Sequence, residues 1–228
     1  IIIGLGGSVT NDGGAGMAQA LGAQFLAVNQ RPIAVNGGQL HLIHHIDLSA
    51  LDARLQQVKI IIASDVSNPL CGENGASYVF AAQKGATSAT LAIFDHNLSH
   101  FADLVEHTLA LHKRYLAGSG AAGGLGFGLM AFTGATLRSG VELVIESTQL
   151  AAKIAQADYV FTGEGSIDFQ TQFGKTPFGV AQVAKRLNKP VIACAGHIGQ
   201  EIEELYDKGF TAIFGIVDGA VDLDTAFA

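Results

Sequence analysis

The stretch ADYVFTGEGSIDFQTQFGKTPFGVAQVAKRLNKPVIACAG, residues 157–196, decides the fold class of this chain. Its first nine residues have the apolar character of a buried strand. Residues 175–188 predict a helix with Pro177 near its start, a position that proline favours. A second strand follows at residues 189–196. Strands joined by a helix through short links form right-handed crossovers, so we predict an α/β protein with a parallel sheet.

The next residues extend this pattern. Residues 200–209 predict another helix, and residues 211–217 predict another strand. Parallel sheets bind ligands beyond the carboxyl ends of their strands, and each of the three strand ends carries glycine with a polar or charged group. We therefore expect one crevice near Gly163, Glu164, Gly165, Asp168, Gly196, His197 and Asp218.

The chain opens on another strand and a glycine-rich loop, IIIGLGGSVTNDGGAG at residues 1–16. Either Asn11 or Asp12 can cap the helix predicted after it. Counted from Gly4, the third glycine of the dinucleotide fingerprint G-x-G-x-x-G is replaced by Val9. Backbone N–H groups at a helix N-terminus favour anions, although the loop matches no common nucleotide signature. We therefore give anion binding and close backbone packing equal weight for this loop.

The middle of the chain supplies a further strand and two helices. Residues 58–66, VKIIIASDV, predict a buried strand that ends near Asp65, and Asn68 follows three residues later. A carboxylate there can bind Mg²⁺ or accept a proton, and an Asx turn explains it equally well. Residues 86–116 have helical periodicity, and residues 122–135 predict a helix of small residues that allows close backbone contact.

Composition excludes several classes of partner. The 228 residues include 29 glycines, 14% are charged, 49% are hydrophobic and the formal net charge is −7. Such an acidic chain is a poor match for nucleic acid or an anionic membrane. No apolar run approaches the roughly 18 residues of a membrane span. Cys71 and Cys194 form no CxxC pair and are interpreted as small buried residues of a reduced, cytoplasmic protein.

Four charged residues in polar loops are candidates for chemistry. Glu164, with Asp168 four residues later, could contact a metal ion or a hydroxyl group of a ligand. The alternative interpretation is that this segment is a solvated turn without a ligand. Lys84 and Lys175 each lie beside a glycine and can neutralise a phosphate or a carboxylate. For each lysine, an ordinary solvated side chain on the surface is an equally weighted interpretation.

The histidines form two sets. His41, His44 and His45 lie close in sequence, and His96 and His100 have the i, i+4 spacing of one helix face. Zinc would require a third ligand and ordered outer partners, and no carboxylate with such spacing is evident, so we interpret the histidines as surface residues.

Four long segments together resemble one family, the bacterial type I glycerate kinases. They are GLGGSVTNDGGAGMAQALG (4–22), SDVSNPLCGENGASYVFAAQKGAT (64–87), GSGAAGGLGFGLMAFTGATLRSGVELV (118–144) and DYVFTGEGSIDFQTQFGKTPFGVA (158–181). The resemblance covers essentially the whole chain, and the spacing between the segments fits as well.

The resemblance implies a fold of two α/β domains with the active site in the cleft between them. Residues 1–146 would be most of an inserted mixed α/β domain. Residues 147–228 would be part of a flavodoxin-like parallel-sheet domain. The implied reaction is ATP- and Mg²⁺-dependent phosphorylation of D-glycerate, typically to 2-phosphoglycerate. No partner other than these small molecules is implied, with a homodimer as a candidate assembly.

Roles for individual residues follow as hypotheses. Asp65 or Asp168 would be the base or the carboxylate that orients the metal ion, with Glu164 in support, and no residue is assigned as a protein ligand of the metal. Lys84 and Lys175 would hold a phosphate or a carboxylate. The remaining candidate binding residues are Gly6, Gly7, Ser8, Asn11, Asp12, Gly13, Gly14, Asn68, Gly163 and Gly165.

The chain also departs from the family pattern. It begins inside a predicted strand at Ile1 and ends at Ala228 in what resembles the start of a helix, so we expect an internal piece of a longer protein. The family's DSFKGS-like and DGGEGT-like segments have no counterpart here, and a chain that lacked them is expected to be inactive alone. A kinase for a related hydroxy acid and a non-catalytic binding module for a small organic acid are the alternatives.

The assignment of Asp65 is open to a direct kinetic test. If its carboxylate is the base, Asp65→Asn removes the proton acceptor and leaves the shape of the site. We therefore expect kcat to fall far more than substrate binding weakens, as measured by steady-state kinetics of glycerate phosphorylation. An unchanged kcat would remove Asp65 from this role.

Overall fold

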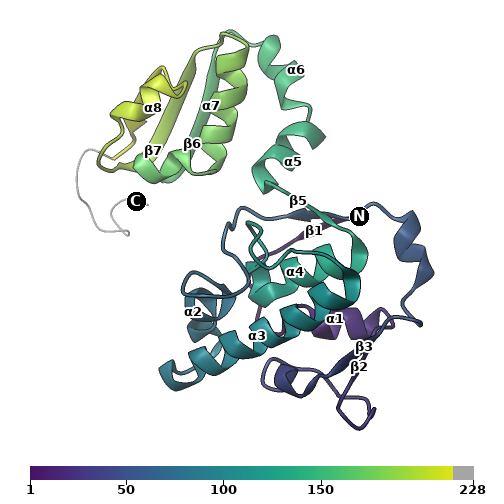
Figure 1. The fold of residues 1–228 in the computed structure, drawn as a ribbon. Helices are drawn as coiled ribbons and strands as arrows, with labels where there is room; N and C mark the ends of the chain where they lie inside the picture. The colour runs from purple at the N-terminus through teal and green to yellow at the C-terminus, as the bar shows by residue number, and fades with distance from the viewer. Residues whose placement is uncertain (218–228) are drawn as a thin grey trace. The chain divides into compact units, whose positions relative to one another are not determined.

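A computed structural model describes residues 1–217, and Asp218, which the sequence analysis grouped with the other strand ends, lies outside the described residues. The chain divides into two compact units, Ile1–Arg138 and Ser139–Ala228, which we call the N-terminal unit and the C-terminal unit (Figure 1). The domain assignment made from the sequence stays a prediction. No described helix has the length and apolar character needed to cross a membrane.

A three-stranded parallel sheet organises the N-terminal unit. Strand β4 (Ile61–Ala63) lies between β1 (Ile2–Gly4) and β5 (Thr136–Arg138), with Ile62 aligned to Ile3 on one side and to Leu137 on the other. Each strand is only three residues long, and β5 was not predicted from the sequence. The carboxyl ends of β1 and β4 lead directly into the two polar loops that carry the candidate residues.

Helices and a small antiparallel sheet build the main core of this unit. The helices are α1 (Ala15–Ala20), α2 (Ala76–Phe80), α3 (Ser88–Leu109) and α4 (Ala121–Thr133), with short 3₁₀ turns η1 (Leu40–Leu42), η2 (Ala53–Gln57) and η3 (Ala82–Lys84). Strands β2 (Gln24–Leu26) and β3 (His45–Asp47) pair antiparallel. Phe25 and Phe101 pack edge to face with ring centroids 5.6 Å apart.

Helix α3 is shorter than its sequence pattern predicts. It ends at Leu109 because Ala110 takes a left-handed conformation with φ of 51°. The carboxylate of the buried Glu106 then accepts hydrogen bonds from the backbone N–H groups of Lys113 (2.7 Å) and Arg114 (2.9 Å). These bonds turn the chain away from the helix axis. Residues 110–116 are therefore irregular, although their sequence has helical periodicity.

Glycine–glycine contact joins the opening loop to α4. A Cβ on Gly128 would lie 2.7 Å from the carbonyl oxygen of Gly13 and 2.8 Å from Cα of Gly14. A Cβ on Gly123, whose φ is +69°, would lie 1.9 Å from the carbonyl oxygen of Thr10. The backbone of the opening loop can therefore approach α4 this closely only because Gly123 and Gly128 have no side chains.

The C-terminal unit has the predicted alternation of strands and helices. After α5 (Gly140–Ser147) and α6 (Leu150–Ala155), the chain forms β6 (Val160–Ile167), η4 (Phe169–Gln172), α7 (Thr176–Arg186), β7 (Val191–Ile198), α8 (Glu203–Asp207) and β8 (Ala212–Gly215). The strands form a parallel sheet in the order β6-β7-β8. The prediction of an α/β protein with a parallel sheet is confirmed.

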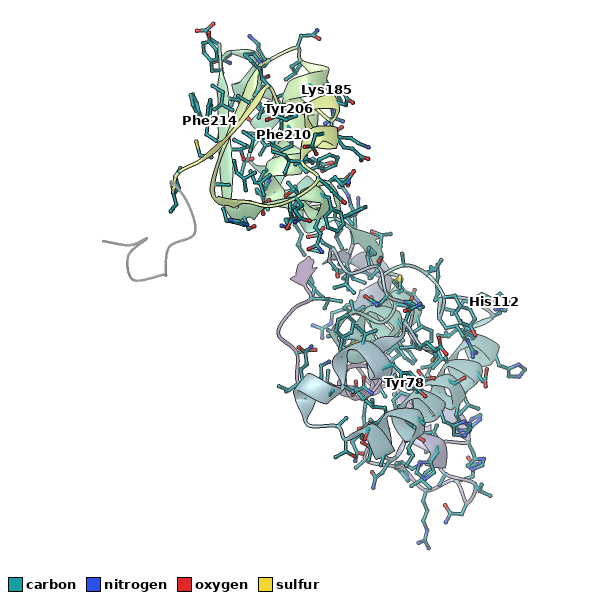
Figure 2. All side chains as sticks on the ribbon, turned by 90° about the vertical axis from the view of Figure 1, so that its left-hand side faces the viewer. Tyr78, His112, Lys185, Tyr206, Phe210 and Phe214 are labelled. Atoms are coloured by element: carbon teal, nitrogen blue, oxygen red, sulfur yellow. The ribbon has the colours of Figure 1, made fainter. Side chains whose placement is uncertain are left out.

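One face of this sheet is covered and the other carries exposed side chains. Helix α7 packs on β6 and β7, and Ala181 and Val191 are fully buried in that core. Phe161 and Phe214 remain 69% and 55% exposed, and Phe214 lies on the face away from Lys185 of α7 (Figure 2). Cys194 is exposed on this face, so its interpretation as a buried residue is wrong. Alternation along β7 turns it away from the helix.

The close packing of α4 predicts an unusual effect of alanine. Gly→Ala inside a helix is ordinarily stabilising by about 1 kcal/mol. Gly128→Ala should instead lower the free energy of unfolding by about 1–3 kcal/mol, because its Cβ meets rigid backbone atoms. Equilibrium urea unfolding measures this difference. Gly4→Ala is the control, since no atom lies within 4 Å of its Cβ position. A stabilised Gly128→Ala variant would show that the contact is absent.

The two cysteines should differ sharply in reactivity. Burial raises the pKa of the Cys71 thiol to about 12, and the Asp95 carboxylate adds to the shift. Because the thiolate is the nucleophile, iodoacetamide at pH 8 should modify Cys194 alone in the folded chain. Peptide mass spectrometry identifies the adduct. Addition of urea should expose Cys71, and equal labelling of both thiols without urea would contradict the structure.

Candidate functional site

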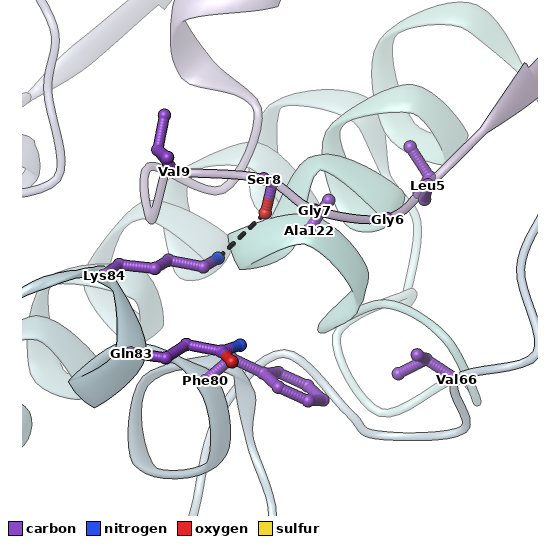
Figure 3. A pocket seen from close by; sticks show the side chains of 10 residues that line it. All are labelled: Leu5, Gly6, Gly7, Ser8, Val9, Val66, Phe80, Gln83, Lys84 and Ala122. Atoms are coloured by element: carbon purple, nitrogen blue, oxygen red, sulfur yellow. Dashed lines mark hydrogen bonds between the residues drawn. The ribbon is translucent and has the colours of Figure 1, made fainter. Parts of the chain in front are cut away.

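The loop after β1 lines a hollow at the carboxyl ends of β1 and β4. This glycine-loop hollow has a volume of about 390 Å³. Figure 3 shows its lining residues, which are Leu5, Gly6, Gly7, Ser8, Val9, Val66, Phe80, Gln83, Lys84 and Ala122. Residues from four separate stretches of sequence therefore meet around it.

Three backbone N–H groups in the first half of this loop have no acceptor in the described part of the chain. Among residues 1–217, no acceptor is hydrogen-bonded to the amides of Gly6, Gly7 or Ser8. Gly6 and Gly7 have no atom within 4 Å of a Cβ position, and the φ of Gly7 is +60°. A short run of unpaired N–H groups on an open glycine backbone is a characteristic anion-binding arrangement.

Lys84 brings a positive charge to the same hollow. Its ammonium group donates hydrogen bonds to Ser8 Oγ (2.9 Å) and to the carbonyl oxygen of Thr10 (2.8 Å), as Figure 3 shows for Ser8. No carboxylate of the described residues forms an ion pair with it. Burial lowers the pKa of Lys84, and the nearby Asp12 carboxylate partly opposes this effect. An anion in the hollow would compensate the charge.

The second half of the glycine loop uses its N–H groups within the chain. The Asp12 carboxylate accepts hydrogen bonds from the amides of Gly14 and Gly16, both at 3.0 Å, and so caps the start of α1. The amide of Gly13 donates to the carbonyl oxygen of Gly123 at 3.0 Å. The structure therefore gives residues 12–14 a packing and capping role, while Gly6, Gly7 and Ser8 face the hollow.

A second hollow also has Lys84 in its wall. We call it the Asn11 hollow, and its volume is about 380 Å³. Its lining residues are Val9, Asn11, Gly37, Gly38, Ala81, Lys84, Gly85, Ala86, Thr87, Thr90 and Phe94. The Asn11 amide donates from Nδ2 to Ser77 Oγ at 3.1 Å, whereas its Oδ1 is buried without a hydrogen-bond partner among the described residues.

The loop after β4 holds the next two candidates. Asp65 is exposed two residues beyond the strand, and its neighbour Val66 lines the glycine-loop hollow. Asn68 donates from Nδ2 to the carbonyl oxygen of Asn74 at 2.9 Å, and its own carbonyl oxygen accepts from the amide of Gly120 at 2.9 Å. Asn68 therefore fixes the shape of this loop.

The C-terminal unit brings Glu164, Asp168 and Lys175 together. Strand β6 continues to Ile167, so Glu164 lies within the strand and not, as the sequence pattern predicts, in a loop after it. Lys175 Nζ lies 3.5 Å from Glu164 Oε2 and 4.0 Å from Asp168 Oδ1. It also donates to the carbonyl oxygen of Ser166 at 3.4 Å. Lys175, unlike Lys84, is thus largely neutralised by carboxylates of its own unit.

Sequence reasoning missed the residue that orders this cluster. Thr171 is fully buried, donates from its hydroxyl to Glu164 Oε1 (2.7 Å) and accepts from the amide of Asp168 (3.3 Å). The Asp168 carboxylate in turn accepts from the amide of Gln170 at 2.8 Å, so Asp168 caps η4. The spacing of Asp168 and Thr171 is that of a capping box, a signal that the sequence contains.

The glycines beside Glu164 differ from each other. A Cβ on Gly163 would lie 2.3 Å from the carbonyl oxygen of Cys194, its partner in β7, so this position serves the sheet. No atom lies within 4 Å of the Cβ position of Gly165. Binding roles for these two glycines stay predictions.

Two of the histidines, His44 and His100, contact each other. His100 Nε2 donates to the carbonyl oxygen of Ile43 at 2.7 Å, and its ring packs against His44 with centroids 6.3 Å apart. In residues 1–217, no group of three or more His, Cys, Asp and Glu side chains is arranged to hold a metal ion.

Comparisons with known proteins agree with this geometry. The model of the glycerate kinase family matches residues 1–228. The chain is 51% identical to a glycerate kinase of Halalkalibacterium halodurans, with 99% of this chain and 60% of the relative covered. It is 47% identical to the glycerate 2-kinase of Escherichia coli, with 100% of this chain and 60% of the relative covered.

A solved structure shares the fold as well. A crystal structure assigned to glycerate kinase 2 of Salmonella typhimurium matches with a TM-score of 0.82 at 48% identity, over 99% of this chain and 59% of that one. The chain thus spans about 60% of the length of the curated relatives that it matches. Because the family model matches every residue, the chain belongs to the glycerate kinase family.

Proposed function

We propose that the protein transfers the terminal phosphoryl group of ATP to a hydroxyl of D-glycerate and releases ADP and phosphoglycerate. The observation that carries the proposal is the glycine-loop hollow. It is lined by three residues whose N–H groups have no acceptor among residues 1–217, and by a lysine that forms no ion pair with a carboxylate of those residues. The names of the relatives support the substrates, and that of the Escherichia coli relative supports the 2-hydroxyl.

Phosphoryl transfer requires mainly positioning and neutralisation of charge. In this proposal, the amides of Gly6, Gly7 and Ser8 and the ammonium group of Lys84 bind phosphate oxygens. The glycerate hydroxyl attacks phosphorus, the bond from phosphorus to the ADP oxygen breaks, and the hydroxyl proton passes to a carboxylate. Asp65 is the candidate for this base because it follows β4, whose carboxyl end borders the hollow.

The carboxylates of the chain fit the way in which Mg²⁺ binds in kinases. Mg²⁺ commonly takes one or two carboxylates and fills its shell with phosphate oxygens and water, so no cluster of three protein ligands is required. Whichever of Asp65 and Asp168 is not the base is the candidate to hold it. When bound, Mg²⁺ would neutralise charge on the phosphates of ATP.

We also propose that the C-terminal unit belongs to a flavodoxin-like domain and that the N-terminal unit belongs to an inserted mixed α/β domain. Parallel sheets are ordinarily covered on both faces, and exposed Phe161 and Phe214 mark an uncovered face of the β6-β7-β8 sheet. A cytoplasmic location and a homodimer stay predictions.

The kinase proposal is tested with the protein as its gene encodes it. Glycerate-dependent formation of ADP from ATP and Mg²⁺ is measured in a coupled assay, and phosphorus NMR identifies the product. Lys84→Met should lower kcat/KM about 100-fold, because it removes the cation from the phosphate site.

Lys59→Met is the matched control, since Lys59 is exposed in the same unit and lines neither hollow. ADP formation that does not depend on glycerate would refute the proposed substrate. Full activity of Lys84→Met would refute the proposed phosphate site.

A further inference from the structure

Ser8 places a hydroxyl group in the wall of the glycine-loop hollow. Among the ten residues that line this hollow, Ser8 is the one whose side chain carries a hydroxyl (Figure 3). The residue is only partly buried, so a ligand in the hollow can reach its side chain. The hydroxyl therefore borders the same cavity as the proposed phosphate contacts.

Lys84 fixes the position of this hydroxyl. Its ammonium group donates to Ser8 Oγ at 2.9 Å and to the carbonyl oxygen of Thr10 at 2.8 Å. An ammonium group has three N–H donors, so these two bonds leave one donor for a ligand. Two acceptors on one tetrahedral ammonium group lie about 4–5 Å apart. If a phosphoryl oxygen takes the third donor, its phosphorus atom can lie in contact with Ser8 Oγ.

The Ser8 hydroxyl is not committed to another partner as a donor. In the described part of the chain, its oxygen accepts from Lys84, and its own proton has no acceptor. Phosphoryl transfer passes through a loose transition state, for which positioning and neutralisation of charge matter more than a strong nucleophile. A hydroxyl held beside the phosphoryl group and its cation meets both requirements.

We propose that Ser8 accepts the terminal phosphoryl group of ATP when no hydroxy acid occupies the site. Ser8 Oγ forms a bond to the terminal phosphorus, the bond from that phosphorus to the ADP oxygen breaks, and the hydroxyl proton passes to water. The products are ADP and a phosphoserine at residue 8. The inference rests on the proposed kinase function, from which it takes ATP as the phosphoryl donor.

The modification inhibits the site that produces it. A phosphoserine carries about 1.5–2 negative charges at pH 7 and has three strong acceptor oxygens. It pairs with Lys84 and occupies the place that the proposed function gives to the phosphates of ATP. Because glycerate and Ser8 compete for the same phosphoryl group, the modified form accumulates when ATP is present and the hydroxy acid is scarce.

Mass spectrometry tests whether Ser8 is the acceptor. The protein as its gene encodes it is incubated with ATP and Mg²⁺ without glycerate, and tandem mass spectrometry of its peptides should place one phosphoryl group on Ser8. Ser8→Ala should abolish this label. Ser88→Ala is the matched control and should be labelled as the parent is, because Ser88 is exposed in the same unit and lines neither hollow.

Lys84→Met distinguishes transfer within the site from the action of a contaminating kinase. The variant keeps Ser8 but loses the cation that holds its hydroxyl, so the rate of labelling should fall about tenfold or more. Labelling of Lys84→Met at the rate of the parent would overturn the inference.

The inhibitory effect predicts a time course. Preincubation with ATP and Mg²⁺ should lower the rate of glycerate phosphorylation in proportion to the fraction of Ser8 that is modified, and a phosphoserine phosphatase should restore the rate. D-Glycerate present during the preincubation should slow both changes. Ser8→Ala should show no such time-dependent loss.

The outcomes separate this inference from the function on which it rests. A protein that phosphorylates glycerate but acquires no phosphoserine at residue 8, or that keeps its full activity when Ser8 is modified, overturns the inference and leaves the kinase proposal standing. A protein that neither phosphorylates glycerate nor modifies Ser8 overturns both.

Discussion

Close backbone contact between the opening loop and helix α4 is the constraint on which the candidate site depends. The amide of Gly13 is hydrogen-bonded to Gly123, and the missing side chain of Gly128 leaves room for Gly13 and Gly14. The loop is thereby fixed at its far end, while β1 fixes its near end through the pairing of Gly4 with Ala63. Between these anchors, the N–H groups of Gly6, Gly7 and Ser8 are held in place without an acceptor among residues 1–217, and a mobile loop could not keep that arrangement.

Charge distinguishes two lysines that the sequence presented as equivalent. Lys175 lies among Glu164, Asp168 and the Ser166 carbonyl oxygen, so its charge is largely balanced within its unit. Within residues 1–217, the hydrogen-bond partners of Lys84 are a hydroxyl and a carbonyl oxygen, and burial lowers its pKa while the nearby Asp12 carboxylate partly opposes this effect. A partly buried cation without a carboxylate is stabilised by an anionic ligand, which makes Lys84 the better candidate for a phosphate or substrate contact.

Regular patterns in the sequence were sufficient for the fold class. The strands at Val160–Ile167 and Val191–Ile198 and the helix between them follow from apolar runs and the position of Pro177. Strands of three residues carry too little pattern, so Thr136–Arg138 was missed. The exposure of Cys194 could not be predicted either, because it depends on which sheet face the helix covers.

The site was less accessible to sequence reasoning than the fold. The residue types in the loop pointed to an anion, but whether each glycine serves packing or binding depends on contacts with residues more than 100 positions away, such as Gly13 with Gly123. Lys84 lines both hollows and reaches Ser8 across 76 positions of sequence, and no local pattern specifies that contact.

The central claim is that the amides of Gly6, Gly7 and Ser8 form an anion site while those of Gly13 and Gly14 do not. Amide chemical shifts in ¹⁵N-labelled protein, followed during titration with tripolyphosphate, test it most directly. The account predicts saturable shifts at residues 6–8 and little change at residues 13 and 14. Shifts confined to Gly13 and Gly14, or none in the loop, would contradict it.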